Sequence, residues 1–108
     1  MAHYLIQVSY TPEAWVALMK NPQDRSKSVG AALAKLGGKM EGFWAAFGDY
    51  DVVAIGQFPD NVSAAAFSMA VSAGGALRAF KTTPLMTAEE AIEAMKKAGK
   101  AGYQPPKD

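Results

Sequence analysis

The stretch that decides the fold runs from residue 37 to residue 58 and reads GGKMEGFWAAFGDYDVVAIGQF. It begins with a Gly-Gly pair, which is typical of a helix end, and continues into two apolar segments at residues 39–47 and 51–58. The four residues GDYD at 48–51 join these segments. Because Gly and Asp tolerate turn geometry, we predict two strands connected by a tight antiparallel hairpin.

A two-residue loop of Asp49 and Tyr50 would set the register of this hairpin. Both faces of the hairpin would then be apolar. Since an antiparallel sheet with one wet face alternates apolar and polar residues, we expect a second layer to cover each face. The predicted pairs are Phe47 with Val52, Ala45 with Ala54 and Phe43 with Gly56 on one face, and Trp44 with Ile55 and Ala46 with Val53 on the other.

Upstream of the hairpin, residues 3–10 alternate with period two and predict a strand. Thr11-Pro12 starts a helix with a capping residue followed by proline. Asn21-Pro22 breaks or kinks this helix, because an interior proline removes a backbone hydrogen bond. The second half keeps a helical spacing of apolar residues and ends at Gly37-Gly38.

Downstream of the hairpin, Asp60 caps a second helix that ends at Gly74-Gly75. Residues 76–86 predict a fourth strand, and TAEE at 87–90 is a capping box that opens a terminal helix ending at Gly99. The second helix has two apolar stripes, which favours burial on more than one side. These stripes are Val62, Ala65, Ala66, Met69 and Ala73, and Phe67 with Val71; Ala88, Ala91, Ile92 and Met95 of the terminal helix are expected to face inward.

The predicted order is β-α-β-β-α-β-α, the split βαβ or ferredoxin-like arrangement of the α+β class. It gives a four-stranded antiparallel sheet with the helices on one face, plus a C-terminal helix. The other apolar face is left for a second subunit, so we expect a homodimer or an assembly of dimers. One domain spans residues 1–98, and residues 99–108 are predicted to be a flexible tail.

Composition narrows the function classes. The 108 residues fit one domain, and eleven basic and ten acidic residues give a net charge of +1 without a Lys/Arg block, which argues against nucleic acid. Cysteine is absent, so there is no disulfide or thiolate metal site. The apolar stretch 62–79 is too interrupted for a membrane span, and residues 1–4 lack the form of a signal peptide. We therefore expect a cytoplasmic protein without a metal site or a cofactor.

Three segments, Tyr10-Thr11-Pro12-Glu13, Gly48 with Tyr50-Asp51, and Arg78-Ala79-Phe80, resemble the GYD-domain family over residues 3–97. That family is named for a Gly-x-Tyr-Asp hairpin. The resemblance implies a dimeric α+β barrel, in which two ferredoxin-like sheets pack face to face. The wider group includes cofactor-independent monooxygenases, lactone isomerases, haem-binding oxidases and stress-induced proteins. The resemblance implies no particular reaction.

Four side chains are candidates for a ligand site. Trp44 and Tyr50 could form its walls, Arg78 could contact an anionic group, and His3 could serve acid–base chemistry. Each also has a structural interpretation: Trp44 as core or interface, Tyr50 as hairpin packing, Arg78 as a partner of a carboxylate, and His3 as a surface residue.

Two functions follow from these residues. One is a small organic ligand bound in or beside the barrel, with cofactor-independent monooxygenase or isomerase chemistry as its catalytic form. The other is a non-catalytic oligomerising sensor or accessory domain. That second hypothesis predicts a filled core without a cavity larger than a few waters.

Overall fold

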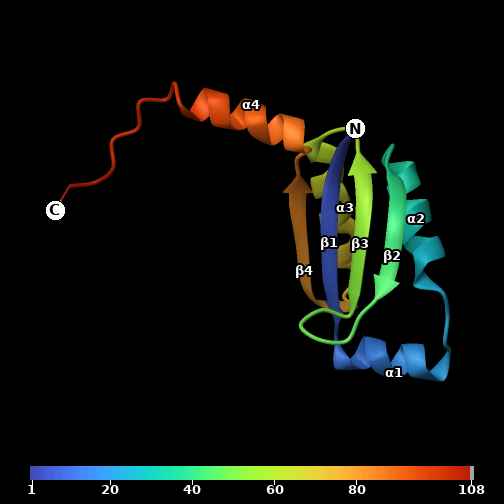
Figure 1. Cartoon of the computed structure of the whole chain (residues 1–108). Helices are drawn as coiled ribbons and strands as arrows, with labels where there is room; N and C mark the ends of the chain where they lie inside the picture. The colour runs from blue at the N-terminus through green and yellow to red at the C-terminus, as the bar shows by residue number, and fades with distance from the viewer. Residues whose placement is uncertain (108) are drawn as a thin grey trace.

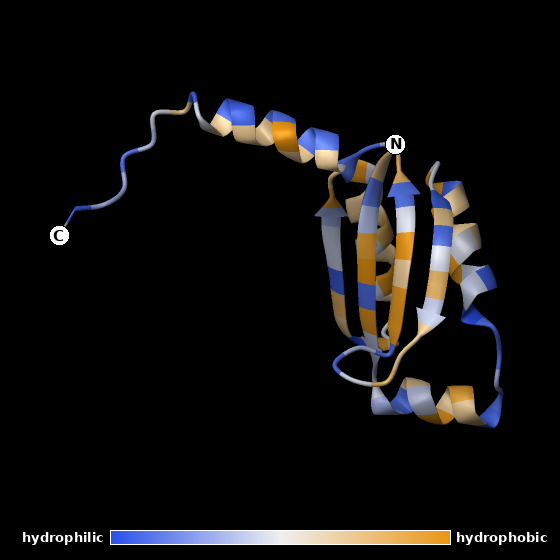
Figure 2. Cartoon of the chain, viewed as in Figure 1, coloured by the Kyte–Doolittle hydropathy of each residue, from blue (hydrophilic) through white to orange (hydrophobic). Residues whose placement is uncertain are grey.

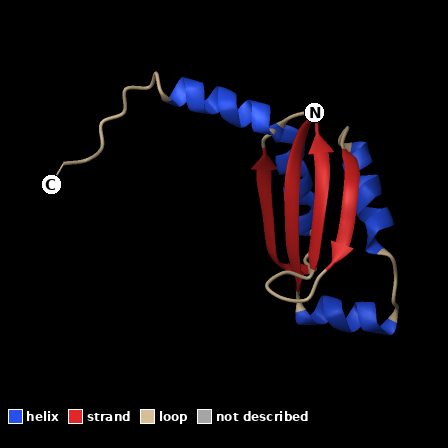
Figure 3. Ribbon diagram, in the orientation of Figure 1, coloured by secondary structure: helices blue, strands red, loops and turns tan. Residues whose placement is uncertain are grey.

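The computed structural model describes residues 1–107 and confirms the α+β ferredoxin-like fold (Figure 1). The strands pair antiparallel in the order β2-β3-β1-β4. Helices α2 and α3 lie behind this sheet, while the face turned to the viewer carries no helix (Figure 3). The elements are β1 (Ala2–Tyr10), α1 (Pro12–Lys20), α2 (Arg25–Lys35), β2 (Lys39–Ala45), β3 (Val52–Phe58), α3 (Asn61–Ala73), β4 (Leu77–Leu85) and α4 (Ala88–Ala98).

The core lies between the sheet and its two covering helices, on what we call the covered face. Phe58 is its centre: its ring meets Tyr4 edge-on at 5.5 Å and Phe67 at 5.6 Å between centroids. The Tyr4 hydroxyl also donates to Asn61 Oδ1 at 2.6 Å and so ties β1 to the start of α3. The buried apolar residues are Tyr4, Ile6, Val8, Leu33, Val52, Ala54, Phe58, Ala64 and Phe67.

The opposite side of the sheet, the open face, carries the alternate residues of the same strands. Leu5, Val53 and Ile55 lie at its centre and are half-buried. Leu5 pairs with Ile55, Val53 pairs with the polar Gln7, and His3 pairs with Gln57 at the border. Figure 2 shows apolar bands crossing the central strands, β1 and β3, of this face. The prediction that both faces of the hairpin are apolar is confirmed.

The break between α1 and α2 is confirmed, but the second helix starts later than the Asn21-Pro22 signal suggested. Asp24 is its cap, and the Asp24 carboxylate accepts from the Ser26 backbone N–H at 2.9 Å. At the other end, Gly38 lies so close to β3 that a Cβ there would overlap the Gln57 carbonyl oxygen. Glycine is therefore required where α2 turns into β2.

The predicted hairpin register is wrong by two residues. Ala45, and not Phe47, pairs with Val52, while Trp44 pairs with Val53 and Phe43 with Ala54. The connection therefore spans residues 46–51 instead of a two-residue turn. The cause is β1: the Asp51 N–H donates to the Val8 carbonyl at 2.8 Å, so the connection folds back over the end of the sheet. A shift of two residues keeps Phe43 and Ala45 on one face and Trp44 on the other, whereas Ala46 and Phe47 lie in the connection and not in β2.

Only one of the two stripes predicted on α3 is packed. Phe67 is buried and Val71 is half-buried against the sheet, whereas Val62 and Met69 of the other stripe are exposed. The expectation that α3 is covered on two sides does not hold within this chain. The described part of the chain has no further layer outside α3.

Helix α4 does not fold inward as predicted. It extends away from the sheet beyond β4 (Figure 1), and Ile92 and Met95 are 51% and 69% exposed. The Thr87 capping box that starts it is present as expected. Residues 99–107 beyond it form no helix or strand. Among the helices described, none has the length and apolar character needed to cross a bilayer.

Candidate functional site

Two cavities adjoin one another on the covered face, and the first, the inner cavity, lies between the sheet, α2 and α3. Its volume is about 300 Å³, and its walls are mostly apolar side chains from all four strands and the two helices. Phe43, Phe67 and Phe80 supply flat aromatic surface to it. The polar side chains on its wall are Tyr10, Arg25 and Ser28.

The second, the outer cavity, has a volume of about 390 Å³ and is lined by α1, the segment linking it to α2, and the adjoining ends of the strands. Its wall includes Trp15, Asp24 and Asp51. Tyr10, Arg25, Phe43 and Val52 line both cavities, so these side chains mark the place where the two meet.

Tyr10 is held at this junction by a backbone hydrogen bond and by a ring contact. It follows an irregularity in the β1–β4 pairing, and its backbone N–H donates to Asp51 Oδ2 at 2.9 Å. Its ring meets Trp15 edge-on at 5.2 Å between centroids. Burial raises the pKa of the Tyr10 hydroxyl, the Arg25 charge lowers it in part, and the Asp51 charge raises it further. The hydroxyl therefore stays protonated at neutral pH and can donate a hydrogen bond.

Arg25 is the first residue of α2 and is half-buried. Its Nη1 donates to Gln23 Oε1 at 3.1 Å. The ion pair found among residues 1–107 is that of His3 with Glu41, so Arg25 has no carboxylate of this part of the chain within ion-pair distance. Its guanidinium thus makes no ion pair within residues 1–107, although the Asp24 and Asp51 carboxylates line the same outer cavity.

The GDYD connection closes the end of the sheet next to this junction. Ser9 Oγ donates to the Asp49 carbonyl at 3.1 Å, and the Ala46 N–H donates to the Asp51 carbonyl at 2.8 Å. With Asp51 bound to both Val8 and Tyr10, the connection holds the end of β1 in place. The Asp51 carboxylate therefore has a structural role in the connection, whereas Asp49 contributes its backbone carbonyl.

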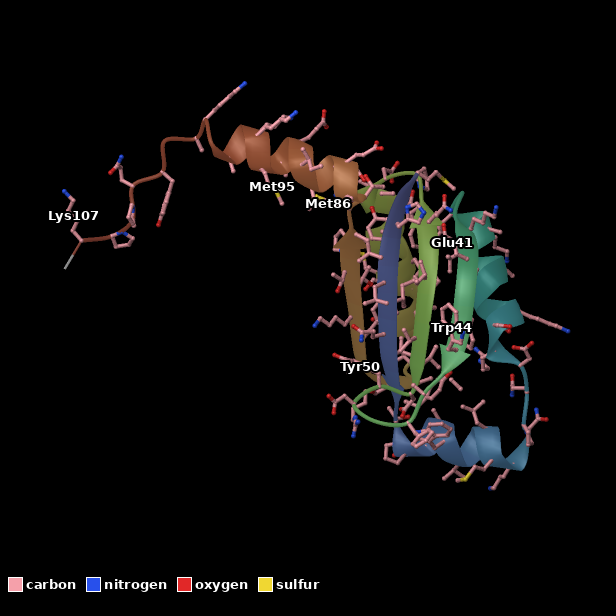
Figure 4. All side chains as sticks on the ribbon, viewed as in Figure 1. Glu41, Trp44, Tyr50, Met86, Met95 and Lys107 are labelled. Atoms are coloured by element: carbon pink, nitrogen blue, oxygen red, sulfur yellow. The ribbon has the colours of Figure 1, made fainter. Side chains whose placement is uncertain are left out.

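His3 and Trp44 lie on the open face, away from both cavities. His3 Nε2 is 2.8 Å from Glu41 Oε1, which also accepts a hydrogen bond from Gln57. The Trp44 indole is 56% exposed and lies over Gly42, where a Cβ would overlap the ring. Figure 4 places Glu41 and Trp44 along β2.

Tyr50 and Arg78 do not lie beside His3 and Trp44. Tyr50 is half-buried in the connection that crosses the lower end of the sheet (Figure 4). Arg78 is exposed and occupies the irregularity of β4, between Leu77 paired with Tyr10 and Ala79 paired with Ser9. Neither lines a cavity described above, and the ligand roles predicted for all four residues stay predictions.

Sequence reasoning missed Tyr10 and Arg25 as a pair. The sequence places Tyr10 at the end of a predicted strand, and Arg25 lies fifteen residues further on, beyond a helix, so no local pattern links the two. One signal was available: Arg25 follows the Asp24 cap, and a cation at the positive end of a helix is unfavourable unless something compensates it. In the described part of the chain, no group of three or more His, Asp or Glu side chains is arranged to hold a metal ion.

Comparison with known proteins supports the fold. The sequence profile of the GYD domain matches residues 4–95 and confirms the resemblance seen in the hairpin. The crystal structure of TTHA0845 from Thermus thermophilus is similar, with a TM-score of 0.54 and 16% identity, over 82% of this chain and 96% of that one. At this identity the similarity is one of fold alone. No curated protein sequence gives a significant match.

Proposed function

We propose that this chain, which belongs to the GYD-domain family, binds a small organic molecule in its inner cavity. The observation that carries the proposal is a mostly apolar cavity of about 300 Å³ between the sheet and its two helices, open to solvent on the side of Ala70, Gly74 and Ala76. A cavity of this size is at the lower end of ligand pockets, roughly 300–1,000 Å³, and its mostly apolar wall suits an apolar ligand.

The competing hypothesis of a non-binding accessory domain predicts a filled core, and the inner cavity counts against it. Catalysis by a monooxygenase or isomerase mechanism would need titratable groups that converge on the ligand. The inner cavity offers the Tyr10 hydroxyl and the Arg25 guanidinium, which suit binding and orientation of a ligand. Binding is therefore the function that the geometry favours.

We also propose that two copies pair through their open faces to form a dimeric α+β barrel in the cytoplasm. Leu5, Val53 and Ile55 leave an apolar patch at the centre of that face, with the 56% exposed Trp44 beside it and the His3–Glu41 pair near its border. Within residues 1–107, α2 and α3 cover the other face, and α1 and α4 extend from the two ends of the sheet (Figure 1). A second copy supplies a matching apolar surface, and an apolar centre with a polar rim is typical of interfaces.

Filling the inner cavity tests the binding proposal. Half-buried Ala32 of α2 lines the cavity, so Ala32→Phe would occupy part of it, whereas Ala31→Phe on the same helix adds the same ring to an exposed position outside it. The probes are 2-naphthoate and naphthalene-2-carboxamide, and binding is followed by calorimetry. We expect the parent chain and Ala31→Phe to bind at least one probe and Ala32→Phe to bind neither.

Two results would contradict the proposal. One is a parent chain that is folded by circular dichroism and binds neither probe; this would favour the accessory hypothesis. The other is Ala32→Phe with the affinity of the parent, which would place the ligand outside the inner cavity.

A further inference from the structure

We infer that the ligand of the inner cavity is a small apolar carboxylate, with its body in the inner cavity and its carboxylate at Arg25. The inference rests on the proposed function and adds the chemical class of the ligand. Arg25 is the one cationic side chain among the residues that line the two cavities.

The environment of the Arg25 guanidinium favours an anion. Arg25 is half-buried against an apolar wall, has Gln23 as a hydrogen-bond partner, and makes no ion pair with residues 1–107. Removing a charge from water is costly unless an opposite charge or hydrogen bonds replace the water. An anion at this position would compensate it, and the planar guanidinium can hold a carboxylate by two parallel hydrogen bonds.

Two carboxylates, those of Asp24 and Asp51, already lie near Arg25 in the outer cavity. Asp24 and Asp51 line the outer cavity but are absent from the wall of the inner one. Both are engaged: Asp24 Oδ1 accepts from the Ser26 backbone N–H at 2.9 Å, and Asp51 Oδ2 accepts from the Tyr10 N–H at 2.9 Å. Their charges disfavour an anion in the outer cavity, so the favourable position for it is the inner-cavity side of Arg25.

The Tyr10 hydroxyl provides a second hydrogen-bond donor on the same wall as Arg25. The Tyr10 hydroxyl lines both cavities together with Arg25 and is protonated at neutral pH. Ser28, one turn along α2 from Arg25, adds a hydroxyl to the inner cavity. The remaining wall has no cation and much aromatic surface. This arrangement matches an aromatic or aliphatic ring that carries one carboxylate.

The experiment compares 2-naphthoate with naphthalene-2-carboxamide, which has a similar shape but no charge, by calorimetry at neutral pH. The variants are Arg25→Met, which keeps much of the side-chain length, and Arg25→Lys, which keeps the charge. Lys27→Met is the matched control, since Lys27 is an exposed cation on the same helix that lines neither cavity. Arg78→Met tests the anion contact predicted from the sequence.

We expect the parent chain to bind the carboxylate at least about tenfold more tightly than the amide, as a charge-assisted contact provides. Arg25→Met should lose this preference and keep its affinity for the amide. Arg25→Lys should keep part of the preference for the carboxylate, and Lys27→Met should show the same preference as the parent chain.

Three results would overturn the inference. Equal affinities of the parent chain for both probes would leave an apolar site without anion selectivity and the proposed function intact. A loss of preference in Arg78→Met but not in Arg25→Met would move the anion contact to β4. Absence of binding by either probe to the folded parent chain would overturn the proposed function itself.

Discussion

The two faces of the sheet come from the same strands and both carry apolar residues at their centres, yet they differ in what covers them. On the covered face, Tyr4, Ile6 and Phe58 are at most 3% exposed beneath α2 and α3. On the open face, the alternate residues of β1 and β3 are only half-buried, and Trp44 of β2 lies more than half exposed. Alternation in a strand thus gives the chemical character of each face but not its partner.

The comparison also separates two kinds of incomplete packing. The covered face has its helices and still leaves the partly open inner cavity between them and the sheet, which suggests room for a ligand. The open face has no covering layer within residues 1–107, which suggests a second copy. One protein can therefore have two unsatisfied apolar surfaces with different occupants, and the predictions below test that difference.

The largest expected effect is on the stability of the covered face. Phe58→Ala removes a fully buried ring that contacts Tyr4 and Phe67, so the free energy of unfolding should fall by about 3–5 kcal/mol. The measurement is urea unfolding at a concentration where the protein is monomeric. Trp44→Ala on the open face, measured alongside, should cost far less under those conditions. Equal losses would mean that the two faces do not differ in the way described.

The next effect is on association through the open face. Ile55→Lys places a charge at the centre of that face, and the proposed dimer should weaken by about a hundredfold, roughly 2.7 kcal/mol. Sedimentation equilibrium measures this constant. Val62→Lys on the outer side of α3, where the side chain is already 79% exposed, should leave it unchanged. A dimer that survives Ile55→Lys but not Val62→Lys would place the interface on the helices.

A smaller effect tests the junction of the two cavities. Since the Arg25 charge lowers the pKa of the Tyr10 hydroxyl against the effect of burial, Arg25→Met should raise that pKa further. Asp51→Asn should lower it, because the Asp51 charge raises it. Ultraviolet titration measures the change, with Tyr10→Phe used to subtract the other tyrosines. An unchanged Tyr10 pKa in both variants would mean that the Arg25 and Asp51 charges do not act on the Tyr10 hydroxyl, and it would contradict the proposed arrangement of the site.

The smallest effect concerns the cap of a helix on the covered face. The Ser63 backbone N–H donates to Asp60 Oδ1 at 2.8 Å, and this bond lowers the pKa of the Asp60 carboxyl below its ordinary 3.8. Asp60 therefore contributes stability above that ordinary pKa, and the contribution is lost as pH falls through the lower, folded-state pKa. Asp60→Asn can still cap the helix but does not titrate. The fall in its melting temperature below pH 3.8 should be shallower than that of the parent chain; an identical slope would contradict this assignment.

The sequence supported the fold well because its signals are local. Thr11-Pro12, Asp60 and the Thr87 capping box each start a helix where predicted. The hairpin register was wrong because the bonds that hold Asp51 come from Val8 and Tyr10, about forty residues away. Nothing in the hairpin itself reveals them.

Helix α4 shows a second limit. Its periodicity correctly identified an apolar side with Ile92 and Met95, but periodicity does not show whether the chain has a surface to receive that side. Figure 4 shows Met95 on the extended helix, away from the sheet. The candidate site has the same limit: Tyr10 and Arg25 meet only because β1 and the start of α2 converge at one end of the sheet, and no spacing rule predicts this.

The measurement that tests the central claim most directly is a methyl NMR titration of the parent chain with 2-naphthoate. It reports on both faces of the sheet in one experiment, because each face carries its own methyl groups. Those lining the inner cavity include Val8, Val29, Ala54 and Val71, and those on the open face are Leu5, Val53 and Ile55. We predict saturable shifts of the first set, with the second set unchanged. Shifts confined to the open-face methyl groups would contradict the account and place the ligand between the subunits.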